Sequence, residues 1–414
     1  MRILFLSNYY PPYEVGGYEQ WCAEVAAELQ RRGHTVEVVS SRVRGATSPV
    51  FGDIPVHRVL DLEAQDGMWQ TALEFPLRSR RASRTLDDLQ QVLVGLRPDV
   101  ALIWGMWNVP RAVPASVERA LPGRVAYYLC DYWPTLPSAY EQYWRTPSGR
   151  LMTKSLKAWA ARTALRQLQG DAQPVLQLQN CYFVSRAVRQ HIADAGVPFR
   201  GGEVIYGGVQ VDQFEATRSA SPAVLAAAPM RLLYVGRICA DKGLHTVVQA
   251  LGKLPRGTVS LTTCGDDSSV YARGQRAEAL RLGIADSVSF VGSVPHSQMP
   301  YVMSQHDVLV FPSIWQEPFA RTVLEAMAAR LVVLGTTTGG TNEVLREGDT
   351  GLTFPPSDSD ALAGQIRRLV EDANLRIRLS AAGYHVVRTA FTFERMADAI
   401  ESELNCMATR GCSV

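Results

Sequence analysis

The sequence predicts an α/β protein built from two successive parallel-sheet units. Short apolar segments that are typical of buried strands alternate with helix-forming segments along most of the chain. The alternation continues to about residue 200 and starts again at residue 230. Continuous apolar strands separated by helices are characteristic of a parallel sheet that is covered on both faces.

Five apolar segments are the expected strands of the first unit. They lie at residues 2–8, 35–41, 99–105, 124–131 and 180–185. A segment of good helix formers follows the first strand at 19–33 and ends at Gly33, and another helix is expected at 185–196.

The same alternation predicts the second unit. Its strands are expected at 230–237, 259–265, 287–292, 307–313 and 331–338, and its helices at 243–254, 275–283 and 317–327. In the last helix, Pro318 is expected in the first turn, where its missing N–H costs nothing, with Glu317 at the helix start. Residues 207–230 are small, polar and without periodicity, so we place the junction of the units there.

The composition is that of an ordinary globular protein. Of the 414 residues, 47% are apolar, and a net charge of +2 argues against nucleic acid as a partner. Seven scattered cysteines without a C-x-x-C pair are typical of reduced cytoplasmic thiols. The apolar run before Ser7 is too short for a signal peptide, and no run approaches the roughly 20 residues of a membrane span. We therefore expect a cytoplasmic protein.

Ligands of open α/β sheets bind beyond the carboxyl ends of the strands. Here five of those ends carry glycine, charge or hydroxyl groups. Gly16 and Gly17 follow the first strand, Arg237 and Lys242 follow the first strand of the second unit, and Gly265–Asp266 follow the next. Packing alone does not explain this convergence, so a ligand site is predicted.

Each of these features also has a purely structural interpretation. Gly16–Gly17 can be a turn before a helix, and Arg237 and Lys242 can lie on a solvated loop. Asp241 can be the partner of Lys242 or a helix cap. The glycines do not follow the G-x-G-x-x-G pattern, which disfavours a dehydrogenase.

Glu317 and Glu325 indicate what the ligand is. Eight helical residues rise about 12 Å, whereas the paired carboxylates of glycosidases stand about 5–10 Å apart. The two glutamates are therefore expected to hold opposite ends of one ligand, with an anion at the N–H groups of the first helical turn between them. A ligand with hydroxyls at each end and phosphate between is a nucleotide-diphosphate sugar.

The order of these motifs resembles one known family. A Gly-Gly loop, R-x4-K, E-x7-E and then the segment 339–362 is similar to the family-4 retaining glycosyltransferases of the GT-B fold. The resemblance extends from Arg2 to about Arg395 and is strongest over 230–362. It implies two Rossmann-like domains that face a central cleft and a C-terminal helix, here 391–404, that crosses back to the first domain.

The resemblance also assigns the domains and the class of enzyme. Residues 1–210, with 391–414 as crossing helix and tail, would bind the acceptor, and residues 211–390 would bind the nucleotide-sugar donor. The expected activity is that of a retaining, hexosyltransferase-type enzyme. The acceptor would be a small molecule, a glycan or a lipid-linked sugar.

Four residues carry the implied chemistry. Arg237 and Lys242 would hold the donor diphosphate and neutralise its growing charge, while Glu317 would contact the transferred sugar and Glu325 the ribose. Two fixed cations and helix N-termini can stabilise a leaving diphosphate without a metal. No metal and no cofactor is therefore expected, and UDP or GDP is the expected leaving group.

The remaining implied donor contacts lie on loops. They are Gly16, Gly17, Gly265, Asp266, Gly292, Ser293, Val294, Pro318, Phe319 and Ala320. The glycines would let main chain approach the phosphate and the base, and the N–H groups of Phe319 and Ala320 would face the sugar or phosphate.

The sequence departs from the family pattern under the donor sugar. Cys130 occupies the position where the family usually has histidine, and Asp131 follows it. The main-chain carbonyl is kept but the imidazole is lost. Either the enzyme dispenses with that side chain, or its donor sugar lacks a group that the histidine would meet, or the activity is weakened. Asn342 and Arg330 replace a usual proline and a usual helix-ending glycine.

The acceptor side leaves two alternatives open. The aromatic residues of 131–147 can stack on an acceptor or form the core of a helical lid. The basic run 78–84 can contact an anionic membrane face, at the inner side of the membrane, or simply be solvated. Two other function classes also remain: a GT-B sugar-nucleotide epimerase and a catalytically weakened nucleotide-sugar-binding protein.

Overall fold

The computed structural model describes residues 1–13, 16–42, 50–63, 68–147, 151–171, 174–215 and 229–410. The chain divides into two compact units. Unit 1 comprises Met1–Val184, Val188–Ile205 and Ala397–Val414, and unit 2 comprises Ser185–Ala187 and Tyr206–Met396. Much of the predicted junction, residues 216–228, lies outside the described residues.

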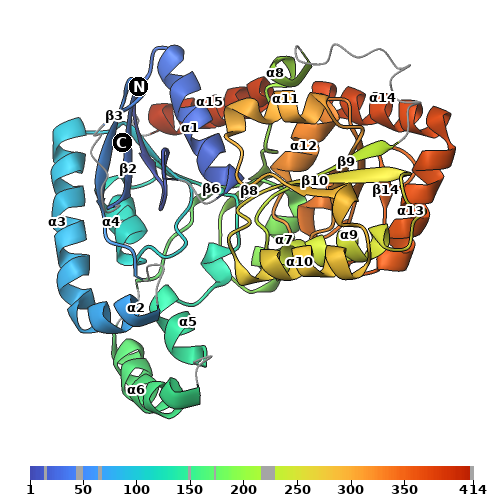
Figure 1. Cartoon of the computed structure of the whole chain (residues 1–414). Coiled ribbons are helices and arrows are strands. Elements are labelled where there is room, and N and C mark those ends of the chain that lie inside the picture. Colours follow the sequence, from blue (N-terminus) through green and yellow to red (C-terminus); the bar gives the residue numbers. More distant parts are fainter. Residues whose placement is uncertain are drawn as a thin grey trace. The chain divides into compact units, whose positions relative to one another are not determined.

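Unit 1 is built on an eight-stranded sheet in the order β3-β4-β2-β1-β5-β6-β7-β8 (Figure 1). The strands are β1 (Arg2–Leu6), β2 (Thr35–Ser41), β3 (Val50–Phe51), β4 (Ile54–Leu60), β5 (Val100–Ile103), β6 (Val125–Leu129), β7 (Asn180–Phe183) and β8 (Gly201–Val204). The pairings are parallel, except that of β3 with β4. Side chains Ile3 to Leu6 of β1 are fully buried, as expected for a central strand covered on both faces.

The helices of unit 1 are α1 (Gly17–Arg31), α2 (Met68–Glu74), α3 (Arg78–Leu96), α4 (Ala112–Ala120), α5 (Ala139–Arg145), α6 (Leu151–Gly170), α7 (Arg186–Asp194) and α15 (Phe393–Arg410). Ser185, which precedes α7, and the first two residues of α7 group with unit 2. Most of α15 belongs to unit 1, where Glu401 accepts from Arg32 at 2.6 Å and pairs with His34 at 2.7 Å. The last helix thus packs on the same unit as the first strand.

A small second core lies among α2, α5 and α6. Phe75, in the turn after α2, stacks edge-on against Tyr140 and Trp144 of α5, and Ala161 and Ala164 of α6 complete the cluster. Tyr140 and Trp144 are therefore buried rather than available for stacking on an acceptor. Of the two readings of the aromatic segment, the helical-core reading is confirmed for these residues.

Unit 2 has a six-stranded parallel sheet in the order β11-β10-β9-β12-β13-β14. Its strands are β9 (Met230–Val235), β10 (Val259–Cys264), β11 (Val288–Phe290), β12 (Val308–Phe311), β13 (Val332–Gly335) and β14 (Leu352–Thr353). Its helices are α8 (Val211–Glu215), α9 (Leu244–Leu251), α10 (Val270–Arg281), α11 (Met299–Ser304), α12 (Arg321–Ala328), α13 (Ser359–Glu371) and α14 (Ala373–Ala390).

Helices cover both faces of this second sheet. Helix α9 packs with α10 and α13, whereas α12 packs with α8 and α14 (Figure 1). Both units therefore have the predicted layered, parallel α/β architecture. Among the described residues, no helix is both long enough and apolar enough to span a bilayer.

Candidate functional site

The loops that follow the carboxyl ends of the unit 2 strands contact one another through their main chains. A Cβ added to Gly243 would lie 2.0 Å from the carbonyl oxygen of Pro312, and one on Gly265 would lie 2.0 Å from that of Gly236. A Cβ on Gly339 would lie 2.1 Å from the carbonyl oxygen of Glu317. Gly243 and Gly339 also have positive φ angles of 74° and 56°. The loops after β9, β10, β12 and β13 meet closely only because glycine stands at these points.

Lys242 and Glu317 form the centre of this edge. The Nζ of Lys242, which ends a short 3-10 turn (Ala240–Lys242) after β9, donates to Oε1 of Glu317 at 2.6 Å. The Ser313 hydroxyl donates to the same carboxylate oxygen. Both side chains are largely buried, at 18% and 9% exposure. The partner of Lys242 is therefore Glu317, and not the neighbouring Asp241 that the sequence suggested as one alternative.

Arg237 lies on the same loop but is much more accessible. Its side chain is 59% exposed, and its guanidinium is 3.7 Å from the Asp241 carboxylate. The carbonyl of Asp241 accepts the N–H groups of Ile314 and Trp315, which ties the loops after β9 and β12 together. An accessible guanidinium beside a buried lysine is a suitable receptor for an anion.

The helix that follows Glu317 begins later than the sequence predicts. Helix α12 starts at Arg321, and Glu317 to Ala320 are extended or irregular. The prediction that Pro318 occupies the first helical turn is wrong, because the backbone here is held by loop contacts. The Gly340 N–H donates to the Glu317 carbonyl at 2.7 Å, and the Ser185 hydroxyl donates to the Pro318 carbonyl at 2.6 Å. The estimate of about 12 Å between the two glutamates assumed continuous helix and does not apply.

Phe319 and Ala320 form the entry to α12. Ala320 is the residue immediately before the helix, and its carbonyl accepts from Val323. Both residues are buried. The main chain predicted to face the sugar thus lies directly after Glu317.

Glu325 is buried in α12 with two basic partners. Its Oε1 accepts from Nε of Arg321 at 2.7 Å and lies 2.7 Å from Nε2 of His296. Burial alone would raise the pKa of Glu325, but Arg321 and His296 together lower it below its usual range. The sequence analysis missed both partners. The i,i+4 spacing of Arg321 and Glu325 was visible in the sequence, whereas nothing there linked His296 to this helix.

The loops after β10 and β11 also lie side by side. The Gly265 N–H donates to the Gly292 carbonyl at 2.9 Å, and Gly292 has a positive φ of 76°. Asp266 is exposed and accepts from the Ser268 N–H at 3.0 Å, so its carboxylate closes a turn. Ser293 and Val294 follow Gly292 on the same loop. These five predicted base contacts are neighbours in unit 2.

The predicted site residues of unit 1 surround the start of α1. Gly16 precedes α1, and its N–H donates to Oε2 of Glu19 at 2.9 Å. The next residues, Gly17 and Tyr18, open the helix, and the Tyr18 hydroxyl donates to Asn8 at 3.0 Å. Glu14 and Val15 lie outside the described residues. Tyr18 and Asn8 were not singled out from the sequence.

Cys130 and Asp131 follow β6 in unit 1. Burial raises the pKa of the Cys130 thiol well above its usual range, and the charge of Asp131 adds to the shift. The thiol is therefore neutral and unsuited to act as a nucleophile. Burial raises the pKa of Asp131 to about 6. The hydrogen bond that its carboxylate accepts from the Trp133 N–H at 3.0 Å acts in the opposite direction and lowers the pKa. Asp131 also raises the pKa of Tyr18 in α1, after the larger effects of burial and of Glu19.

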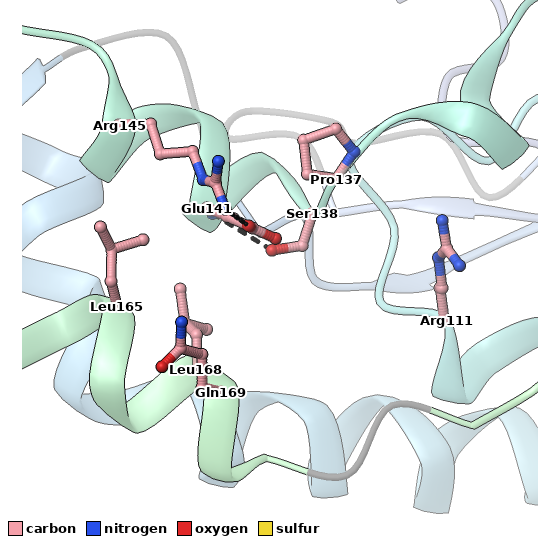
Figure 2. Close-up of a pocket in the computed structure, with 8 residues that line it drawn as sticks. All are labelled: Arg111, Pro137, Ser138, Glu141, Arg145, Leu165, Leu168 and Gln169. Carbon is pink, nitrogen blue, oxygen red and sulfur yellow. Dashed lines mark hydrogen bonds and ion pairs between the residues drawn. The ribbon is translucent and has the colours of Figure 1, made fainter. Parts of the chain in front are cut away.

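Unit 1 contains a separate cavity of about 270 Å³ between α5 and α6 (Figure 2). Its lining residues are Arg111, Pro137, Ser138, Glu141, Arg145, Leu165, Leu168 and Gln169. Arg145 and Glu141 pair at 2.6 Å across one turn of α5. None of these residues was predicted to bind a ligand.

Acidic, histidine and cysteine side chains do not gather into a metal-binding group in the part of the chain that the structure describes. Metal independence stays a prediction, because it concerns the reaction. The predicted residues thus form one cluster in unit 2 and another in unit 1, each described within its own unit.

Two parallel, Rossmann-like α/β units in one chain are the architecture of the GT-B fold. Residues 15–213 match the model of Glycosyltransferase Family 4, and residues 222–386 match the model of Glycosyl transferases group 1. The chain belongs to the group 1 glycosyltransferases.

Curated relatives are similar over almost the whole chain. Glycogen synthase of Mycobacterium tuberculosis is 26% identical over 99% of this chain and 96% of its own length. A GDP-mannose-dependent alpha-(1-6)-phosphatidylinositol monomannoside mannosyltransferase of the same organism is 25% identical over 96% of each chain.

Solved structures share the fold. A glycosyltransferase from Rickettsia africae has a TM-score of 0.72 at 19% identity, with 98% of each chain covered. HepE of Anabaena, solved in complex with UDP and glucose, has a TM-score of 0.69 at 20% identity, with 98% of this chain and 100% of HepE covered.

Proposed function

We propose that the protein is a retaining, metal-independent glycosyltransferase that moves a hexose from a nucleotide-diphosphate sugar to an acceptor hydroxyl. The observation that carries this proposal is the buried Lys242–Glu317 pair beside the accessible Arg237, at the strand ends of unit 2. Relatives support the donor class: one is GDP-mannose-dependent, and HepE has been solved with UDP-glucose. UDP and GDP are therefore the expected leaving groups.

Arg237 and Lys242 would stabilise the leaving diphosphate. The bond between the anomeric carbon and the β-phosphate oxygen breaks, and the electron pair stays on the diphosphate. The acceptor oxygen bonds to the same face of the anomeric carbon, and its proton passes to the departing phosphate. Because Glu317 holds Lys242 before substrate arrives, the ammonium is already positioned where negative charge grows. No metal is needed for this step.

The other unit 2 residues would hold the rest of the donor. Glu325 would accept a ribose hydroxyl, and Glu317 would contact the sugar. The N–H groups of Phe319 and Ala320 would face the sugar or phosphate. The loops carrying Gly265–Asp266 and Gly292–Val294 would line the base.

Unit 1 would supply the acceptor side. Gly16 and Gly17, at the start of α1, would let main chain approach the phosphate and the acceptor. Cys130 and Asp131 would lie under the donor sugar. A small molecule, a glycan or a lipid-linked sugar is the proposed acceptor class, and the relatives include enzymes of phosphatidylinositol mannoside and lipopolysaccharide core synthesis.

Donor turnover tests this function directly. We expect sugar nucleotide to be consumed only when an acceptor is present, and chelator to leave the rate largely unchanged. The measurement is nucleotide-diphosphate release from a panel of UDP- and GDP-sugars, with and without candidate acceptors. Acceptor-independent conversion of the donor to its epimer would indicate the epimerase instead. Tight binding without turnover would indicate a binding protein, and loss of activity that only added metal restores would contradict metal independence.

The product should keep the anomeric configuration of the donor. Because the acceptor oxygen enters on the face from which the diphosphate leaves, an α-linked donor is expected to give an α-linked product. Proton NMR of the first product reports this through the coupling of the anomeric proton. An inverted product would contradict the same-face mechanism while leaving the transferase activity intact.

A further inference from the structure

One face of helix α6 packs against the rest of unit 1, and the other face is exposed to solvent. Ala161 and Ala164 are buried in the small core with Phe75 and α5, and Leu165 and Leu168 pack against that core. The opposite side of the helix is open to solvent, and Figure 1 shows α6 beyond α2 and α5 at the margin of unit 1.

The outward face carries large apolar side chains. Trp159 is 68% exposed and Leu156, three residues before it, is 61% exposed. Residues three apart lie on the same side of a helix, so these two side chains form one apolar strip. Leaving both side chains in water costs free energy, because exposed tryptophan and leucine lose the hydrophobic contribution that a core position would give.

The same face is positively charged. Arg162 and Arg166 follow Trp159 by three and seven residues, and both are exposed. Together with Lys154 and Lys157 they give α6 four cations, and its sequence contains no Asp or Glu. Lys157 lies over the Tyr143 ring at 4.0 Å, whereas Lys154, Arg162 and Arg166 have no ion-pair partner among the described residues.

The basic run 78–84 differs from α6 in this respect. Arg78 pairs with Asp171 at 2.9 Å, Arg84 pairs with Asp61 at 2.7 Å, and Arg81 pairs with Glu74. Three of its four arginines are therefore neutralised within unit 1. The segment for which the sequence left membrane contact open is mostly a structural ion-pair network, and α6 offers the free positive charge.

We propose that the outward face of α6 docks unit 1 onto the surface of an anionic lipid bilayer. Trp159 and Leu156 would enter the interface between headgroups and acyl chains, and Arg162 and Arg166 would contact lipid phosphates. A second copy of the chain is a poor occupant, because two such faces would bring like charges together. The inference goes beyond the proposed function and does not depend on it.

Vesicle sedimentation of the full-length protein tests this surface. The wild type should bind phosphatidylcholine vesicles that contain phosphatidylglycerol, bind pure phosphatidylcholine much less, and dissociate as salt is raised. The double variant Leu156→Ser/Trp159→Ser should lower the partition about tenfold. Arg162→Gln/Arg166→Gln should lower it about fivefold for each arginine.

Matched variants elsewhere provide the controls. Val270→Ser/Leu280→Ser removes two apolar side chains from α10 that are at least as exposed as Leu156 and Trp159. Arg119→Gln/Arg367→Gln removes two exposed arginines from α4 and α13. Both should bind vesicles like the wild type. All variants should keep the wild-type Tm and wild-type turnover with a soluble acceptor, so a failed transferase assay and a failed vesicle assay are separate results.

Two outcomes would overturn the proposal. The first is equal vesicle binding by the wild type and both α6 variants. The second is a wild type that does not bind anionic vesicles at low salt, including the case in which it forms a dimer that Trp159→Ser dissociates. A wild type that binds nucleic acid but not anionic vesicles would also overturn the proposal.

Discussion

Replacing Lys242 with alanine is expected to lower kcat/KM about 10²–10³-fold, equivalent to about 2.7–4 kcal/mol. Glu317 holds the ammonium in place, and in the proposed mechanism its loss removes the charge that stabilises the leaving diphosphate. Steady-state kinetics with a UDP- or GDP-sugar measure the effect. Wild-type turnover in this variant would contradict the proposed role of Lys242.

A matched lysine and a second substitution separate chemistry from folding. Lys253, whose ammonium pairs with Asp360 at 2.7 Å in the same unit, should tolerate alanine with unchanged kinetics. Lys242→Ala also leaves the Glu317 carboxylate buried without its cation, so the variant should lose stability. Adding Glu317→Gln should recover part of that stability. Because Glu317 is itself proposed to contact the sugar, the double variant is compared with Glu317→Gln alone. A slower double variant of similar stability would show that the loss of Lys242 affects the reaction and not the folding.

Replacing Glu325 with alanine is expected to destabilise unit 2 by about 3–5 kcal/mol. Arg321 is buried and would lose the carboxylate that neutralises it, and His296 would lose the same partner. Denaturant titration measures the loss. The double replacement Arg321→Leu/Glu325→Leu removes both charges and should be much more stable than the single variant.

The same double variant tests the binding role of Glu325. If Glu325 only supports α12, the stabilised double variant should bind nucleotide diphosphate like the wild type. If it also holds the ribose, calorimetry should show an affinity loss of about 1.5–3 kcal/mol even though the fold is restored. An Arg321→Gln variant, which keeps Glu325, should bind the nucleotide more tightly than the double variant.

The sequence predicted strands correctly where side chains alone define them. The apolar segments that became β1, β5, β6, β9 and β12 are buried on both faces, so their composition is unambiguous. Three strands of unit 1 were not predicted: the two-residue β3 and the longer β4 and β8. Strand β8 begins with Gly201 and Gly202, both at positive φ, and β4 contains Pro55, His57 and Arg58. Their neighbours in the sheet, rather than their own residues, determine these strands.

The candidate site was predictable in its residue types but not in its pairings. Charge and glycine at the strand ends identified Lys242, Glu317 and Glu325. The start of α12 was misplaced because contacts from Gly340 and Ser185 hold Glu317 and Pro318 outside the helix. His296 could not be linked to Glu325 from the sequence, since the two residues are 29 positions apart and α11 and β12 lie between them.

The glycine contacts between the unit 2 loops limit how this protein can diverge. At Gly243, Gly265 and Gly339 the loops touch main chain to main chain, so any side chain there would push a neighbouring loop away. A change in the length of one of these loops would likewise displace the loop at the neighbouring strand end. Under the proposed function, new donor preferences are therefore most accessible through side chains at exposed loop tips near the proposed base contacts, such as Asp266 and Ser293. Libraries for altered sugar-nucleotide use should randomise those tips and leave the glycines fixed.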